Sequence, residues 1–173
     1  MTAGAHRLGR AALLEPLIPQ LRRYAYAMTR DHESADDLVQ DTLERALSRW
    51  ALRRRDGDLR AWLFAIERNL HVSSIRTRRR RPESALDAAD EPGGPATQEA
   101  GLAARDALEA LDHLPEDHRT VLLLVGVEDL TYEETARVLD LPVGTVMSRL
   151  SRARTRLRAL IETGRSGYLR RVK

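Results

Sequence analysis

The chain has 173 residues, a net charge of +3, and 42% hydrophobic but only 4% aromatic residues. This length suffices for one average domain or two small ones, and so few aromatic side chains disfavour a continuous sheet. With no cysteine, disulfides, thiol catalysis and thiolate zinc sites are excluded. Leu, Ala, Arg and Glu are abundant, so we expect an all-α protein.

Three helices are predicted in the N-terminal part. The first runs from near Pro16 to Thr29, where apolar residues recur at helical spacing. The second begins at Ser34 as its N-cap, with acidic residues in its first turn where they complement the helix dipole. The third runs from about Asp58 to Arg76. The expected core positions of the second and third helices are Leu38, Leu43, Ala46, Leu47, Trp50, Leu59, Trp62, Leu63, Ile66 and Leu70.

A different face of the third helix carries Phe64, Arg68, His71 and Ile75. This face either packs against a second neighbour or touches nucleic acid through a ring and two basic groups. Charge is also segregated along the chain: residues 31–44 are acidic, whereas residues 76–81 and 149–158 are rich in arginine. Separate blocks of opposite charge suggest distinct partners on distinct surfaces.

Residues 78–100 contain three prolines and a Gly-Gly pair without apolar periodicity, which indicates a flexible linker. We therefore expect two small helical domains. Four helices are predicted after the linker, at residues 99–113, 115–127, 132–139 and 143–161. Thr131 and Glu134 form a capping-box pattern, and residues 140–142 break the chain before the last helix.

On a helical wheel, the last helix gathers apolar residues on one side and hydroxyl and guanidinium groups on the other. Arginine can bind guanine edges or phosphates, and a capped helix and short turn in front complete a helix-turn-helix. The alternative is a solvated arginine face. Thr131 and Tyr132 would lie near the phosphate backbone, because helix N-termini favour anions. The polar side consists of Thr145, Ser148, Arg149, Arg152 and Arg156.

The stretch "LPEDHRTVLLLVGVEDLTYEETARVLDLPVGTVMSRLSRARTRLR" resembles the promoter-reading domain of bacterial extracytoplasmic-function (ECF) sigma factors. "ADDLVQDTLERAL" resembles their core-polymerase-binding helix, and "LRAWLFAIERNLHVSSIRTRRR" resembles their promoter-opening segment. The resemblance implies a region 2-like domain at residues 8–81, a linker at 82–100 and a region 4-like domain at 101–165.

The resemblance also implies roles for individual residues. Contacts to the clamp helices of core RNA polymerase fall on Asp37, Gln40, Asp41, Thr42 and Arg45. Contacts to the promoter -10 element fall on Arg68, Asn69, His71, Arg76, Arg78 and Arg79. The polar side of the last helix would read the -35 element. Met147 stands where many family members carry Lys or Arg, so it either packs at the edge of the apolar stripe or touches a thymine methyl.

The implied function is promoter-specific transcription initiation, in a stress or envelope response, with an anti-sigma factor holding the protein inactive. A stand-alone helix-turn-helix regulator that binds DNA as a dimer is the alternative. An enzyme is disfavoured: the only candidates for a metal-holding carboxylate site are Asp36, Asp37 and Asp41, which have no supporting histidine or P-loop, and the five histidines lack metal-ligand spacing. We expect no cofactor and no metal. No apolar run approaches the ~20 residues of a bilayer span, and no secretion signal is evident, so we expect a cytoplasmic protein.

Overall fold

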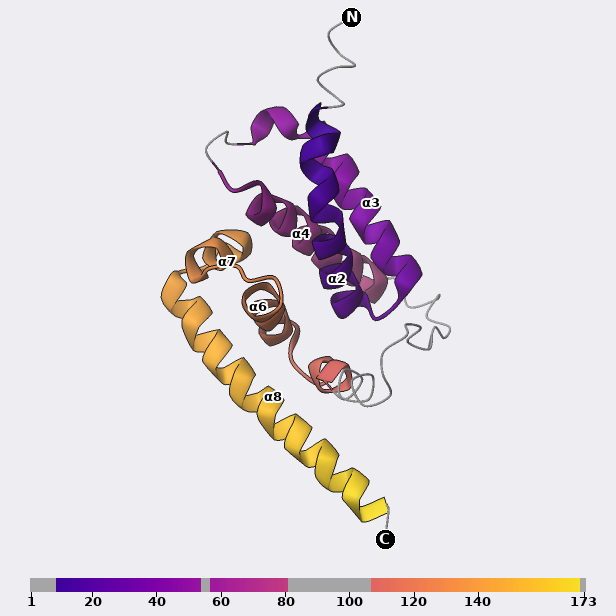
Figure 1. Cartoon of the computed structure of the whole chain (residues 1–173), viewed down its shortest axis with the longest axis vertical. Helices are drawn as coiled ribbons and strands as arrows, with labels where there is room; N and C mark the ends of the chain where they lie inside the picture. Colours follow the sequence, from indigo (N-terminus) through magenta and orange to yellow (C-terminus); the bar gives the residue numbers. More distant parts are fainter. Residues whose placement is uncertain (1–8, 54–56, 81–106, 172–173) are drawn as a thin grey trace, which may run out of the picture. The chain divides into compact units, whose positions relative to one another are not determined.

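The computed structural model describes residues 9–53, 57–80 and 107–171. The described residues contain helices and turns but no strand, which confirms the all-α prediction (Figure 1). They divide into two compact units, the first built on α2, α3 and α4 and the second on α6, most of α7, and α8. The elements are η1 (Glu15–Leu17), α2 (Ile18–Thr29), α3 (His32–Ser48), η2 (Trp50–Leu52), α4 (Leu59–Arg80), α6 (Glu116–Gly126), α7 (Tyr132–Leu139) and α8 (Val143–Arg171).

In the first unit, α2 and α3 run antiparallel and are joined by a tight turn (Figure 1). Arg30 adopts the left-handed conformation with φ 61°, which reverses the chain. Asp31 then caps α3, because its Oδ2 accepts a hydrogen bond of 2.7 Å from the amide of Ser34. The predicted cap at Ser34 is therefore wrong. Ser34 lies inside the helix and is the donor to the cap.

The core of the first unit forms where α2 and α4 pack on α3. Tyr24 and Phe64 are fully buried and meet edge to face, with ring centroids 5.4 Å apart at 73°. The buried face of α4 carries Phe64, Glu67 and His71, whereas most of the predicted stripe is only half-buried. Of that stripe, Leu63 alone is fully buried. The face of α4 that packs against α2 and α3 thus lies about 100° around the helix from the predicted one. The prediction that Phe64 and His71 pack against a neighbour is confirmed.

Hydrogen bonds to Asp58 fix the start of α4, and the helix ends later in the sequence than predicted. Asp58 Oδ1 accepts from the Arg60 amide at 2.9 Å, and the Asp58 carbonyl accepts from the Trp62 amide at 3.1 Å. The helix continues to Arg80, four residues beyond the predicted end. Arginine is a strong helix former, so the arginine-rich residues 76–80 extend α4.

In the second unit, α6 packs against α8. Leu123 and Leu124 of α6 are buried, as are Val146, Leu150 and Ala153 of α8. The predicted helix over 132–139 is confirmed as α7. Residues 107–112 are helical, which agrees with the end of the predicted helix over 99–113. The start of that helix and the predicted linker at 82–100 lie outside the described residues.

Candidate nucleic-acid interface

The turn between α7 and α8 has the geometry of a helix-turn-helix. Thr131 Oγ1 accepts from the Glu134 amide at 3.1 Å, and Glu134 Oε2 accepts from the Thr131 amide at 2.7 Å. This is the predicted capping box. Asp140 closes α7 in the left-handed conformation with φ 53°. The carbonyl of Pro142 then accepts from the amides of Thr145 and Val146 and starts α8.

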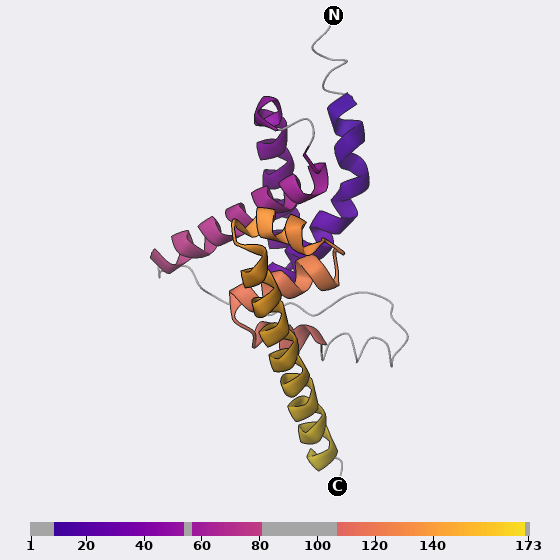
Figure 2. The same cartoon turned by 90° about the vertical axis from the view of Figure 1, so that its left-hand side faces the viewer.

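The residues on the polar side of α8 differ in their exposure to solvent. Ser148, Arg152 and Arg156 are exposed, whereas Thr145 and Arg149 are half-buried. Ser148 is oriented by its own helix, since its hydroxyl donates to the Thr145 carbonyl at 3.0 Å. At the start of α7, Thr131 is exposed and Tyr132 is half-buried. Figure 2 shows α8 as one uninterrupted helix. Residues 145, 149, 152 and 156 are spaced three or four positions apart, so they share one face of this helix.

Arg149 is held by an acidic residue of another helix. Its Nη1 lies 3.0 Å from Asp117 Oδ2, and Asp117 belongs to the first turn of α6. The Arg149 side chain is 28% exposed and that of Asp117 is 56% exposed. This ion pair ties the candidate reading helix to the helix that supports it. Sequence analysis missed Asp117, because the two residues lie 32 positions apart and no local pattern pairs them.

The outward face of α8 is broader than the predicted strip. Gly144, Met147, Ser148 and Ser151 are all exposed in its first turns. Met147 does not pack at the edge of the apolar stripe, because 52% of its surface is exposed to solvent. Gly144 and Ser151 were missed as candidates. The spacing i−3 and i+4 from Met147 is the sequence signal that could have identified them.

The acidic helix α3 presents most of its predicted contact residues. Asp37, Gln40, Asp41 and Arg45 are exposed, and Gln40 Nε2 donates to Glu44 Oε1 at 3.0 Å. Thr42 is an exception, being 0% exposed. Its hydroxyl donates to the Leu38 carbonyl at 2.7 Å inside the helix packing. We therefore correct the prediction that Thr42 is a surface contact: it belongs to the core.

The basic residues of α4 lie mainly on its surface. Asn69, Arg76 and Arg78 are exposed, and Arg68 is half-buried with its Nη1 3.5 Å from Asn69 Oδ1. The side chain of Arg79 lies outside the described ones. His71 is only 6% exposed, because it lies on the buried face of α4. We therefore leave His71 out of the residues proposed to touch DNA.

An open groove of about 330 Å³ in the first unit is lined both by residues predicted to contact core polymerase and by residues predicted to contact the -10 element. Asp37 and Asp41 of α3 line one side, and Ser74 and Arg78 of α4 line the other, with His71 among the lining residues. Apolar lining residues come from all three helices: Met28, Leu38, Leu70 and Ile75. The groove can therefore accept an apolar group flanked by polar or charged atoms.

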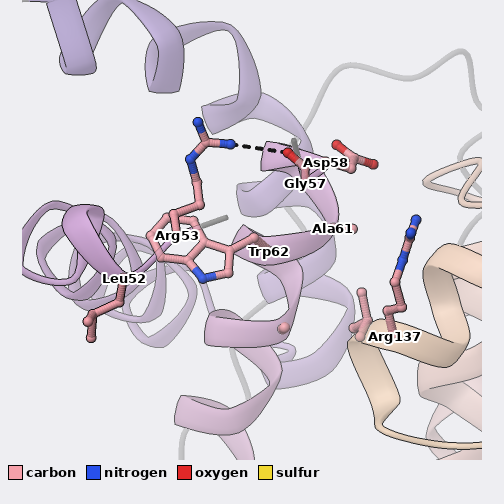
Figure 3. Close-up of a pocket in the computed structure, with 9 residues that line it drawn as sticks. Leu52, Arg53, Gly57, Asp58, Ala61, Trp62 and Arg137 are labelled. Atoms are coloured by element: carbon pink, nitrogen blue, oxygen red, sulfur yellow. Dashed lines mark hydrogen bonds between the residues drawn. The ribbon is translucent and has the colours of Figure 1, made fainter. Parts of the chain in front are cut away.

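A second cluster of aromatic and basic side chains surrounds η2. Arg10 and Arg53 lie over the Trp50 ring at 5.7 and 5.4 Å, and Trp50 meets Trp62 edge-on at 6.2 Å. The guanidinium of Arg53 also donates to the Gly57 carbonyl at 3.1 Å (Figure 3). Both tryptophans are half-buried. Such cation–π contacts orient the arginines while one part of each ring stays accessible. Sequence analysis missed Arg10 and Arg53, because no local sequence pattern pairs either arginine with the Trp50 ring.

Within residues 9–53, 57–80 and 107–171, no helix is both long and apolar enough to cross a bilayer. In the same part of the chain, no group of three or more His, Cys, Asp or Glu side chains is arranged to hold a metal ion.

This arrangement defines a two-unit helical protein in which α7 and α8 form a helix-turn-helix. Residues 14–67 match the model of the sigma2 domain of PhyR, and residues 104–157 match the model of sigma-70 region 4. The ECF RNA polymerase sigma factor EcfG of Rhodopseudomonas palustris is 41% identical over 149 residues, which cover 83% of this chain and 80% of EcfG.

Solved structures agree with these matches. The sigma factor RpoE from Bartonella quintana, in complex with the anti-sigma factor NepR, superposes with a TM-score of 0.79 at 34% identity. The match covers 89% of this chain and 97% of RpoE. CnrH, in complex with the cytosolic domain of CnrY, gives a TM-score of 0.69 at 26% identity, covering 88% of this chain and 87% of CnrH. The chain belongs to the extracytoplasmic-function sigma factors of bacterial RNA polymerase.

Proposed function

We propose that this chain is a dissociable subunit that binds core RNA polymerase and directs it to a subset of promoters. The observation that carries this proposal is the capped helix-turn-helix whose second helix exposes Ser148, Arg152 and Arg156. Guanidinium and hydroxyl groups on one helical track can enter a major groove and bind base edges and phosphates. By this proposal α8 reads the -35 element, and Thr131 and Tyr132 at the start of α7 lie near a phosphate.

The proposed polymerase contact is the exposed surface of α3. Asp37, Gln40, Asp41 and Arg45 share this surface, and Arg22 of α2 braces it through an ion pair with Asp36 at 2.7 Å. Acidic and amide groups on a rigid helix suit a partner helix that carries basic side chains. The partner we propose is the pair of clamp helices of core polymerase.

The proposed -10 contact is the basic half of α4, comprising Arg68, Asn69, Arg76, Arg78 and Arg79. Binding a separated strand requires positive charge along the backbone and surfaces for unstacked bases. Melting would then be driven by binding energy for that strand, and this chain would hydrolyse nothing. The corresponding domains are a region 2-like domain at 8–81 and a region 4-like domain at 101–165, with a linker at 82–100.

Regulation by an anti-sigma factor is the second part of the proposal. RpoE and CnrH, both similar to this chain, were solved in complexes with NepR and with the cytosolic domain of CnrY. We propose that a protein of this kind holds the chain inactive and releases it in a stress or envelope response. Both polymerase and promoter DNA would be met in the cytoplasm.

Run-off transcription on a promoter library tests the function directly. Purified core polymerase is assayed alone, with the full chain, and with the double variant Arg149→Ala, Arg152→Ala. We expect initiation at a subset of promoters with the wild-type chain and its loss with the variant. If core polymerase never responds and the chain alone shifts a specific palindromic duplex, a stand-alone regulator replaces the proposed function.

A further inference from the structure

Met147 is a large apolar side chain on α8 that faces solvent. Its residue is 52% exposed, whereas Val146 and Leu150 beside it are buried. A single exposed apolar residue on a protein surface is common and needs no explanation. The position of Met147, in the second turn of the helix proposed to enter the major groove, is what makes its exposure informative.

The neighbours of Met147 on the outward face are small. Gly144, Ser148 and Ser151 stand at i−3, i+1 and i+4, and all are exposed. A Cβ atom added at Gly144 would meet no atom within 4 Å, so the space in front of this turn is open. The backbone of α8 can therefore approach another molecule closely here, and Met147 is the side chain that projects furthest from this patch.

The chemistry of Met147 restricts what it can read in DNA. A thioether offers no hydrogen-bond donor and only a weak acceptor, so amino and carbonyl edges of bases gain little from it. The apolar group of the major groove is the thymine 5-methyl, and apolar side chains read thymine through it. Methionine is unbranched and flexible, so it can adapt to a methyl group at slightly different depths.

We propose that Met147 is a specificity-determining residue that contacts a thymine 5-methyl group within the -35 element. Arg152, exposed farther along α8, supplies the charge that holds the helix in the groove. This inference rests on the proposed function, because it requires α8 to lie in the major groove of promoter DNA.

The test removes the methyl group from the DNA. Holoenzyme assembled from core polymerase and the full chain selects its -35 element from a randomised promoter library. Each thymine of the selected element is then replaced by deoxyuridine, which lacks only the 5-methyl group. We expect one position to lose about fourfold in affinity, since burying one such group is worth ~0.8 kcal/mol. Met147→Ala should bind the thymine and deoxyuridine forms of that position equally.

Two further variants make the test specific. Met147→Leu keeps an apolar side chain and should keep the preference for thymine. Val127→Ala removes an exposed aliphatic side chain of the same unit, 42% exposed but off α8, and should leave it unchanged. A selected element without any methyl-sensitive position, or equal sensitivity in Met147→Ala, overturns the contact alone. A library from which no -35 element is selected overturns the proposed function and the contact with it.

Discussion

Arg149 illustrates how one residue of α8, the proposed reading helix, is held in place by another helix of the fold. Its pair with Asp117 is partly exposed, and such pairs stabilise by at most ~1 kcal/mol. Asp117→Ala should therefore change the free energy of unfolding by less than ~1 kcal/mol. It should raise affinity for non-specific DNA, because a negative charge near the phosphates is removed, and should lower selectivity for the -35 element, because Arg149 is no longer oriented.

Competition binding of holoenzyme to promoter and scrambled duplexes measures both effects, and urea unfolding of the full chain measures stability. Asp117→Glu keeps the charge and should restore most of the selectivity. A loss of several kcal/mol in stability, with selectivity intact, would instead make Asp117 a purely structural residue.

Asp31 predicts a dependence of stability on pH. Two hydrogen bonds from Ser34 hold the pKa of the Asp31 carboxyl below its ordinary value. The hydrogen bond from the Ser34 hydroxyl has the larger effect, and the one from its amide has the smaller. A carboxyl whose pKa is lower in the folded state stabilises fully above its unfolded pKa, and this contribution is lost as pH falls through the folded pKa. Thermal unfolding from neutral to strongly acidic pH should show that loss in wild type. Asp31→Asn, which can still cap the helix, should lack this component, and an unchanged pH profile in Asp31→Asn would contradict the assignment.

At the scale of elements, the capping box of α7 sets the stability of the helix-turn-helix. Thr131→Ala removes the acceptor for the Glu134 amide and should lower stability by ~1 kcal/mol. Thr131→Ser should restore it, because a serine hydroxyl accepts the same hydrogen bond. Chemical unfolding of the full chain, followed by circular dichroism, measures the difference. Equal stability of the alanine and serine variants would show that the cap contributes nothing.

Two adjacent residues of α3 lie in different environments, one on the surface and one in the core. Asp41 is exposed whereas Thr42 is buried, so their substitution should give opposite results. Asp41→Arg should weaken binding to core polymerase by tenfold or more, about 1.4 kcal/mol, because a charge is reversed at the proposed contact. Thr42→Val should cost stability through the lost hydrogen bond to Leu38, but should leave polymerase affinity within about twofold, well under 1 kcal/mol. Fluorescence titration with core polymerase distinguishes them, and equal losses in both variants would argue against α3 as the contact.

What the sequence predicts correctly depends on whether the cause is local. Thr131 and Glu134 lie three positions apart and satisfy each other, so this capping box could be predicted from four residues. Asp31 and Ser34 are both good capping residues, and the left-handed turn at Arg30 decides between them. That turn is not evident from local spacing.

Other features depend on neighbours that are distant in sequence. The buried face of α4 is the one that α2 and α3 cover, which helical periodicity cannot identify when both faces carry apolar residues. Met147 is exposed because α6 covers an adjacent sector of α8. The Arg149–Asp117 pair has the same origin. The residues that tertiary packing places are therefore the ones that sequence analysis misplaced or missed.

At the scale of the whole molecule, the net charge of +3 conceals basic blocks that we propose bind phosphates. Each phosphate neutralised by a Lys or Arg releases counterions, so affinity for promoter DNA should fall steeply as salt rises. Arg152→Ala should reduce the slope of log affinity against log salt by about one, because one such contact is lost. Arg22→Ala is the matched control: Arg22 is also exposed but pairs with Asp36 on the proposed polymerase side. Its slope should equal that of wild-type holoenzyme. An equal fall in both variants would mean that the salt dependence reports total charge, and that α8 holds no privileged phosphate contact.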